Sequence, residues 1–188
     1  TMQWISVLGE VESKIVDCFR EGGGVPYEDY SRFHTVMADE SDKTVVQPLV
    51  DTILPNCPGV AEALEQGIDV LDVGCGSGRA MIAAAQRFPN SRFTGYDLCE
   101  DTIVAARQRA AEQGVANVAF RRQDAATMEH VEAFDLVTAF DAIHDQAHPA
   151  EVLSRISVAL RSGGTFLMQD IAASSDVENN IDSPLGPF

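Results

Sequence analysis

The chain has 188 residues, of which 45% are apolar, so it is long enough and apolar enough to fold as one domain with its own core. This composition excludes a disordered chain. Acidic residues outnumber basic ones by 29 to 13, and the resulting formal charge of -16 argues against nucleic acids and anionic membrane surfaces as partners.

The cysteines and the ends of the sequence give indications of where in the cell the protein is found. None of the four cysteines forms a C-x-x-C pair, and no histidine lies at ligand spacing from one, so we predict neither a metal site nor a disulfide framework. Reduced thiols, the lack of a signal peptide and the lack of an apolar run of about 20 residues favour a cytoplasmic protein. Because the chain begins with Thr1 and stops in PLGPF, we expect it to be an excerpt of a longer protein.

The sequence pattern of residues 1–58 predicts a helical N-terminal segment. Apolar residues recur there at helical spacing, at Ile5, Leu8, Val11, Ile15 and Phe19. Glycines 22–24 then break the helix, and a second helix is expected at about residues 41–54. We expect this segment to pack against the sheet or to cover its top edge as a lid.

Residues 59–188 predict a second unit, in which short apolar runs alternate with helical patterns. Strands are predicted at residues 70–73, 93–97, 118–122, 134–140 and 165–169. Helices are predicted at residues 78–88, 101–113 and 149–160, and glycines 163 and 164 are expected to end the last one. The alternation predicts an α/β fold with a Rossmann-like, doubly wound, mainly parallel sheet. Ligands of such sheets bind beyond the carboxyl ends of the strands.

The stretch VLDVGCGSGRA is a glycine loop at the first of these strand ends. Gly74 permits a tight turn, Gly76 lets the backbone approach a ligand, and Gly78 opens the helix. A dinucleotide fingerprint would have a further glycine where Arg79 stands. Asp72 is poorly placed to help an anionic pyrophosphate, whereas it could attract an ammonium group.

Two further acids end the next two strands. Asp97 lies 19 residues after Gly78, where a carboxylate can accept hydrogen bonds from both ribose hydroxyls. Asp124 could accept the amino group of adenine, and its neighbour Ala125 leaves room for the ring. The three acids together favour a ligand with an amino-acid end and a nucleoside end.

The sequence resembles the class I S-adenosylmethionine-dependent methyltransferases. The resemblance rests on DVGCGSGRA, GYDL, the Asp124 position and FDLVTAFDAIHD, which are similar to motifs I to IV of that family. GGGVPYEDYSRFH, DAIHDQAHP and MQDI resemble the small-molecule methyltransferases of the mycobacterial Rv2258c type. The class I fold has seven strands and only five are predicted here, so the resemblance implies that the C-terminal strands are missing or come from a partner.

The resemblance implies S-adenosylmethionine as the cofactor and assigns roles to individual residues. The cofactor loop would be Gly74, Cys75, Gly76 and Gly78. Asp72 would face the methionine amino group and Asp97 the ribose. Asp124, Ala125 and Leu98 would hold the adenine, Phe140 would contact the methionyl part through its backbone, and Tyr27 and Phe33 would close over the cofactor.

The segment after the fourth strand holds the catalytic candidates. His144 beside Asp145 could serve as a general base for an acceptor that must lose a proton. Structural hydrogen bonding by His144 is the alternative. Asp141 is expected to shape the floor of the pocket.

The leading hypothesis is therefore methyl transfer to a small-molecule acceptor. A non-catalytic cofactor-binding module and a nicotinamide-dependent oxidoreductase are the alternatives, and the second lacks the glycine and the tyrosine-lysine pair that it would need. The sequence does not identify the acceptor, and it leaves a homodimer open.

Overall fold

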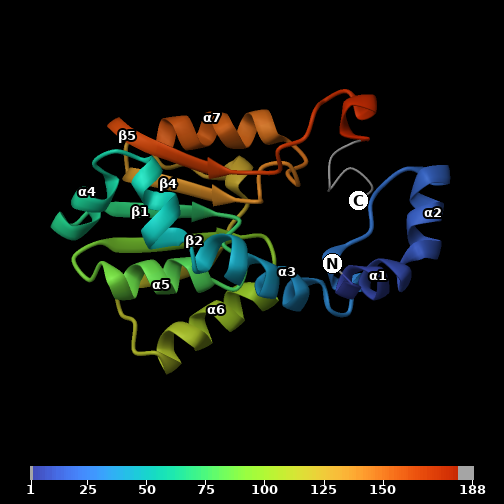
Figure 1. The fold of residues 1–188 in the computed structure, drawn as a ribbon, viewed down its shortest axis with the longest axis horizontal. Helices are drawn as coiled ribbons and strands as arrows, with labels where there is room; N and C mark the ends of the chain where they lie inside the picture. The colour runs from blue at the N-terminus through green and yellow to red at the C-terminus, as the bar shows by residue number, and fades with distance from the viewer. Residues whose placement is uncertain (1, 182–188) are drawn as a thin grey trace.

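The computed structural model describes residues 2–181 and contains one five-stranded parallel sheet, in the order β3-β2-β1-β4-β5 (Figure 1). The strands are β1 (Asp69–Val73), β2 (Arg92–Asp97), β3 (Val118–Arg122), β4 (Phe134–Phe140) and β5 (Leu160–Gln169). The helices that alternate with them are α4 (Val60–Gln66), α5 (Arg79–Arg87), α6 (Glu100–Glu112) and α7 (Pro149–Ala159), with a short turn, η5 (Ala125–Thr127), after β3. The prediction of a doubly wound parallel sheet with five strands is confirmed.

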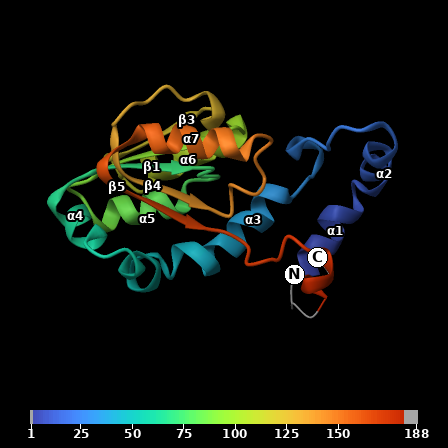
Figure 2. The same cartoon turned by 90° about the horizontal axis from the view of Figure 1, so that it is seen from above.

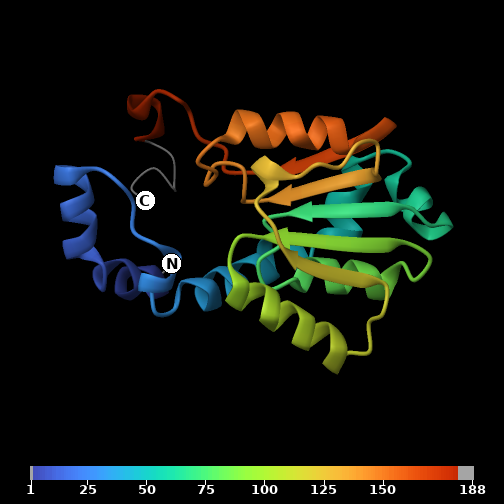
Figure 3. The same cartoon turned by 180° about the vertical axis from the view of Figure 1, so that it is seen from behind.

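Helices cover both faces of this sheet (Figures 1 and 3). On one face, α4, α5 and α6 pack against Val70, Phe93 and Phe120. On the other face, α7 packs against Val137 and Ala139. The central strand β1 is buried on both sides from its second residue onward, which explains why it is a continuous apolar run apart from Asp72.

The predicted end of α7 and the start of β5 are wrong. The helix ends at Ala159, and the strand begins at once, five residues before the predicted start. Glycines 163 and 164 therefore lie inside β5 and do not terminate the helix. The register against β4 shifts there, because Phe134 pairs with Leu160 whereas Leu136 pairs with Thr165. The extra residues form a bulge, for which Gly163 supplies a positive φ of 81°.

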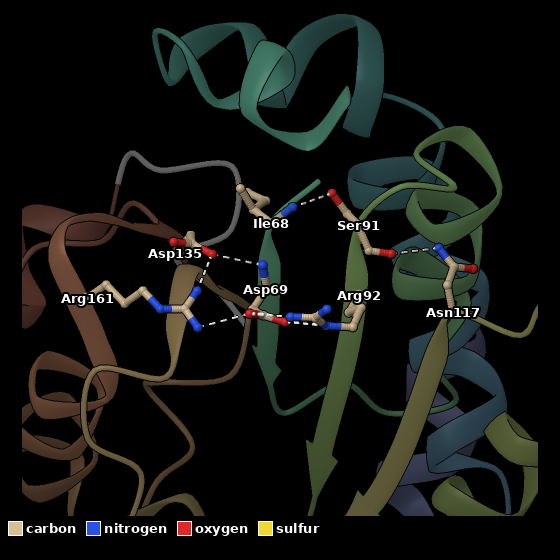
Figure 4. Close-up of polar contacts among 7 residues, drawn as sticks. All are labelled: Ile68, Asp69, Ser91, Arg92, Asn117, Asp135 and Arg161. Carbon is tan, nitrogen blue, oxygen red and sulfur yellow. Dashed lines mark hydrogen bonds and ion pairs between the residues drawn. The ribbon is translucent and has the colours of Figure 1, made fainter. Parts of the chain in front are cut away.

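The bulge contributes to a polar network at the amino ends of the strands (Figure 4). Arg161 donates to Asp69 at 2.9 Å and to Asp135 at 2.5 Å. Arg92 donates to both carboxylate oxygens of Asp69, at 2.7 and 2.9 Å. The backbone N–H of Asp69 donates to Asp135. These bonds tie β1, β2, β4 and β5 together at the edge opposite the carboxyl ends.

Residues 2–56 are mainly helical, as predicted, but the helices are shorter and more numerous than the sequence pattern indicates. The elements are α1 (Met2–Gly9), α2 (Glu12–Glu21), η1 (Tyr27–Asp29), α3 (Phe33–Ser41), the π-helical turns η2 (Asp42–Val46) and η3 (Leu49–Ile53), and η4 (Leu54–Asn56). The sequence reasoning missed α3 and α4 and predicted one helix across η2 and η3, where Pro48 lies between two separate turns.

The predicted apolar stripe of the first helix is wrong in part. The helix stops at Gly9 and restarts at Glu12, so residues at helical spacing no longer share one face. Val7 and Val11 are buried, whereas Ile5 is 70% exposed and Phe19 is 88% exposed.

The helices α1, α2 and α3 lie beyond the carboxyl ends of the strands, whereas η3 and η4 run back along the face of the sheet and pack Leu49 and Leu54 into its core. In Figures 1 and 2, α3 runs toward that edge of the sheet, and α1 and α2 lie farther out. In the part of the chain that the structure describes, no helix is both long and apolar enough to cross a bilayer.

Candidate active site

A cavity of about 190 Å³ opens at the carboxyl ends of the strands, under the N-terminal segment. It lies where the strand order reverses between β1 and β4, which is the usual ligand site of a doubly wound sheet. The predicted site residues that line it are Tyr27, Phe33, Asp72, Gly74, Cys75, Gly76, Asp97, Leu98, Ala125, Phe140 and Asp141. Gly78, Asp124 and His144 are not among its lining residues.

The glycine loop between β1 and α5 forms one wall of the cavity. The backbone N–H groups of Gly74 and Cys75 both donate to the carbonyl of Tyr96, which anchors the loop to β2. Gly76 has φ +50°, and a Cβ built on it would meet no atom within 4 Å, so its open side is free for a ligand. Gly78 is different, because a Cβ there would lie 2.5 Å from the Phe120 ring. Gly78 therefore serves close packing between the helix and the sheet.

Cys75 has its side chain turned into the protein rather than into open space. Its Sγ lies 3.7 Å from the carbonyl oxygen of Gly76. Burial raises the pKa of the thiol well above its usual range. A small, neutral side chain at this position agrees with a packing role beside the ligand.

Asp97 connects the loop to the start of α6. Its Oδ2 accepts the N–H of Gly76 at 2.8 Å, and its Oδ1 accepts the N–H of Cys99 at 2.9 Å and the Thr102 hydroxyl at 3.2 Å. These bonds fix the carboxylate at the cavity wall. Leu98, which follows it, is half exposed and also lines the cavity.

Asp72 is the most unusual group of the site. It is 3% exposed, and its Oδ1 accepts a hydrogen bond of 2.6 Å from Thr138 on β4. Burial, aided by the charge of Asp97 and opposed by the Thr138 hydrogen bond, raises the pKa of Asp72 to about 7. A buried carboxylate with a raised pKa at a cavity wall would be stabilised in its ionised form by a cationic ligand.

Asp124 lies beside the cavity rather than on its wall. Its carboxylate accepts the N–H of Ala126 at 2.8 Å and so caps the turn η5. This turn places the buried Ala125 on the cavity wall, next to Gln123. Sequence reasoning missed Gln123, because a glutamine before the predicted acid carries no signal of its own.

An aromatic group from the N-terminal segment covers the cavity. The ring centroids of Tyr27 and Phe33 lie 4.8 Å apart, and those of Phe33 and His34 lie 5.6 Å apart. The Tyr27 hydroxyl donates to Oδ2 of Asp145 at 3.3 Å. Burial and the nearby Asp145 raise the pKa of Tyr27 to about 12, so the hydroxyl remains a donor at neutral pH.

Arg79 joins the N-terminal segment to the glycine loop. The guanidinium donates to the carbonyl of Ala38 at 3.2 Å and forms ion pairs with Asp42 and with Asp39. The residue that departs from the dinucleotide fingerprint thus holds α3 and η2 against α5. The sequence showed the departure but not its purpose, because the partners lie about forty residues away.

Asp141 begins the segment after β4 in a strained conformation. Its φ is +49°, which is uncommon for a residue other than glycine and concentrates at functional sites. Its N–H donates to the carbonyl of Gln169. Burial raises the pKa of Asp141, and the charge of Asp170 adds to this.

His144 lies in the same segment, between the cavity-lining residues Ala142 and Asp145. Its Nδ1 lies 2.5 Å from Oδ1 of Asp170, directly after β5. Its Nε2 lies 3.4 Å from Oδ1 of Asp145. Sequence reasoning expected Asp145 alone to accompany the ring and missed Asp170, although Asp170 also lies at the carboxyl end of a strand.

Comparisons with known proteins agree with this geometry. A family model described as "Methyltransferase domain" matches residues 64–184. A ubiquinone biosynthesis O-methyltransferase of Leptothrix cholodnii is 32% identical over 107 residues, which are 56% of this chain and 45% of that protein. Nocamycin O-methyltransferase of Saccharothrix syringae is 40% identical over 75 residues, which are 39% of this chain and 27% of that protein.

Solved structures share the fold. A putative methyltransferase of Bacillus halodurans matches 64% of this chain and 55% of its own, with a TM-score of 0.55 and 30% identity. The [4+2]-cyclase SpnF matches 62% of this chain and 46% of its own, with a TM-score of 0.57 and 27% identity.

The matched part of this chain spans less than half the length of either curated relative. The family model nevertheless covers more than half of the chain, and it includes every strand of the sheet and the cavity walls that the strands provide. The chain belongs to the methyltransferase domain family.

Proposed function

We propose that this protein is an S-adenosylmethionine-dependent methyltransferase that acts on a small-molecule acceptor. The observation that carries the proposal is Asp72, a buried carboxylate at the cavity wall with its pKa raised to about 7. The amino group of the cofactor would supply the cation that this carboxylate lacks. The cofactor, when bound, supplies a methyl group on a positively charged sulfur.

The other walls of the cavity fit the remaining parts of that cofactor. Gly74, Cys75 and Gly76 would hold the methionyl part, together with the backbone of Phe140, and Gly78 would keep the loop close to the sheet. Asp97 would accept the ribose hydroxyls. The adenine would lie against Leu98 and Ala125, with Asp124 near its amino group.

The N-terminal segment, residues 1–58, is proposed to act as a lid on the domain of residues 59–188. Three contacts support this role. Tyr27 bonds Asp145, Arg79 bonds Asp42, and the side chain of Gln169 lies 3.4 Å from the carbonyl oxygen of Thr44. Tyr27 and Phe33 would then cover the bound cofactor.

The acceptor is proposed to be a small molecule that is methylated next to Asp141 and His144. The curated relatives described above are named O-methyltransferases, which supports oxygen as the attacking atom.

The net charge of -16 disfavours a nucleic-acid acceptor or an anionic membrane surface, and the free thiols of the cysteines agree with a cytoplasmic location. We also propose that the protein is related to the Rv2258c-type enzymes and that it forms a homodimer.

Calorimetry tests the cofactor. We expect S-adenosylhomocysteine to bind with micromolar affinity and NAD not to bind, because Asp72 opposes a pyrophosphate. An Asp97→Ala variant should lose at least tenfold in affinity. The control Asp101→Ala, which changes an exposed acid in the first turn of α6, should not. Binding of NAD without S-adenosylhomocysteine would overturn the proposal.

A non-catalytic cofactor-binding module is the second candidate. The fold by itself does not decide against it, because the similar fold of SpnF is named for a reaction other than methyl transfer. Methyl transfer from labelled S-adenosylmethionine to any small acceptor, measured with the full-length protein, decides between the two.

A further inference from the structure

We propose that Asp170 positions His144 as the general base for an acceptor that is a hydroxyl group; this rests on the methyltransferase function proposed above. The carboxylate of Asp170 accepts two hydrogen bonds from His144, one from the ring Nδ1 at 2.5 Å and one from the backbone N–H at 3.3 Å. It also accepts the N–H of Ile171 at 2.8 Å. The side chain of Asp170 is 16% exposed and that of His144 is 38% exposed, so the carboxylate is largely covered while the ring stays open to an acceptor from solvent.

The hydrogen bond between Asp170 and His144 determines which ring nitrogen of His144 carries the hydrogen. Burial works against ionisation of Asp170, but the hydrogen bonds from Ile171 and His144 outweigh it and lower its pKa. An ionised carboxylate can only accept, so Nδ1 of His144 must carry the hydrogen. The lone pair of the neutral ring is therefore on Nε2, which is the nitrogen able to take a proton.

Nε2 of His144 lies 3.4 Å from Oδ1 of Asp145, and Asp145 lines the cavity and accepts a hydrogen bond from Tyr27. The ring thus stands beside the cavity wall, next to a residue that forms it. Among the described residues, the charged groups that face the ring are the carboxylates of Asp141, Asp145 and Asp170, from the end of β4, the loop after it and the end of β5. An imidazolium formed by proton abstraction would therefore face carboxylates at both ring nitrogens, Asp170 at Nδ1 and Asp145 at Nε2.

This arrangement selects for an acceptor that must lose a proton. The hydroxyl proton passes to Nε2 of His144, the oxygen forms a bond to the methyl carbon, and the electron pair of the broken carbon–sulfur bond stays on sulfur. A neutral hydroxyl and a sulfonium become a neutral ether, a thioether and an imidazolium, so charge and atoms balance. A carboxylate or a tertiary amine would need no base, and a thiol is partly ionised near neutral pH. The hydroxyl class gains most from this base.

The first test uses the protein without any acceptor. Nitrogen-15 spectra of the histidine rings should show the Nδ1–H tautomer for His144 at neutral pH, with the signal assigned by its loss in His144→Gln. In Asp170→Asn this preference should disappear, whereas in Asp176→Asn, an exposed acid farther along, it should persist. An Nε2–H tautomer in the wild-type protein would overturn the proposal.

The second test compares two acceptors that differ in acidity, catechol and 4-nitrocatechol, at pH 8. Asp170→Asn should lower kcat on catechol by about 100-fold, the usual contribution of a general base, with KM little changed. On 4-nitrocatechol, which is largely ionised at that pH, the loss should be several-fold only, and Asp170→Glu should restore part of the activity. Equal losses on both acceptors would show that Asp170 has only a structural role and would overturn the proposal.

The proposed cofactor and the proposed hydroxyl acceptor can be disproved separately. If S-adenosylhomocysteine does not bind in calorimetry, the proposed function fails. If it binds but methyl transfer reaches only benzenethiol, benzylamine or benzoate, or none of the probes, the inference about a hydroxyl acceptor fails while the cofactor assignment stands.

Discussion

Two aspartates on the central strand, Asp69 and Asp72, have opposite environments. At the amino end of β1, Asp69 is bonded by Arg92 and Arg161, and the hydrogen bond from Arg92 is the main cause of its lowered pKa (Figure 4). Three residues later, Asp72 accepts a hydrogen bond from Thr138 and has no ion-pair partner among residues 2–181, and burial raises its pKa to about 7.

The difference separates a structural end of the sheet from a functional end. At the amino ends, Arg92 and Arg161 supply the cations, and the carboxylates of Asp69 and Asp135 hold the strands together. At the carboxyl ends, carboxylates from β1, β2 and the segment after β4 surround a cavity, and Arg79 on its wall is already paired with Asp42 and Asp39. A cation that compensates Asp72 is therefore expected to come from a ligand.

Asp72→Asn is the substitution expected to have the largest effect. It keeps the size of the side chain but removes the charge, so the affinity for S-adenosylhomocysteine should fall at least 100-fold in calorimetry. The same variant should be more stable than the wild-type protein in urea at pH 8, by up to about 4 kcal/mol at roughly 1.4 kcal/mol per pKa unit.

The size of the stability gain in Asp72→Asn depends on pH. The folded protein binds the Asp72 proton more tightly than the unfolded chain does, so wild-type stability falls as pH rises from about 4 to about 7. The gain in Asp72→Asn should therefore be largest above pH 7 and should nearly vanish by pH 4. A variant that is destabilised at pH 8 would show that Asp72 has a structural role like that of Asp69.

The pH dependence of binding gives the next largest effect. Because the protonated form of Asp72 offers no charge to an ammonium group, affinity for S-adenosylhomocysteine should fall below pH 7, approaching about tenfold per pH unit. Calorimetry between pH 5.5 and 8 measures this slope. In Asp72→Asn the slope should be much reduced, and an unchanged slope would assign it to another group.

The amino end can be tested with Arg161→Met. This change removes the ion pairs with Asp69 and Asp135, so the unfolding temperature should drop by a few degrees, while binding of S-adenosylhomocysteine should stay within twofold. Arg155→Met is the matched control, because Arg155 is similarly exposed but contacts only Glu151 on its own helix, at 3.7 Å. A loss of binding in Arg161→Met would break the separation between the two ends.

The sequence predicted the carboxyl end better than the amino end. Asp72 and Asp97 line the cavity as their places at strand ends predict, because parallel topology brings those ends together, whereas Asp124 caps η5 beside the cavity. The network of Asp69, Arg92 and Arg161 was not predicted, since it depends on a bulge in β5 that the glycines at 163 and 164 had suggested to be the end of a helix.

Contacts between distant parts of the chain also could not be predicted from the sequence. Arg79 with Asp42, and His144 with Asp170, join residues 37 and 26 positions apart, and no local pattern marks such pairs. The lid residues Tyr27 and Phe33 were predicted only through the family resemblance. The structure places them on the cavity wall, although whether they touch a cofactor is still a prediction.

Tyr27→Phe tests the lid and should have the smallest effect. The change removes only the hydroxyl that donates to Asp145, and the ring stays in place against Phe33, so affinity for S-adenosylhomocysteine should fall about threefold, as for one exposed hydrogen bond. Because the pKa of Tyr27 is about 12, the difference between variant and wild type should be constant from pH 7 to pH 9. Tyr30→Phe is the control, since Tyr30 packs near Phe33 but does not line the cavity. If Tyr27→Phe and Tyr30→Phe have equal effects, the Tyr27 hydroxyl does not hold the lid, and Arg79 with its partners on α3 and η2 must be the main attachment.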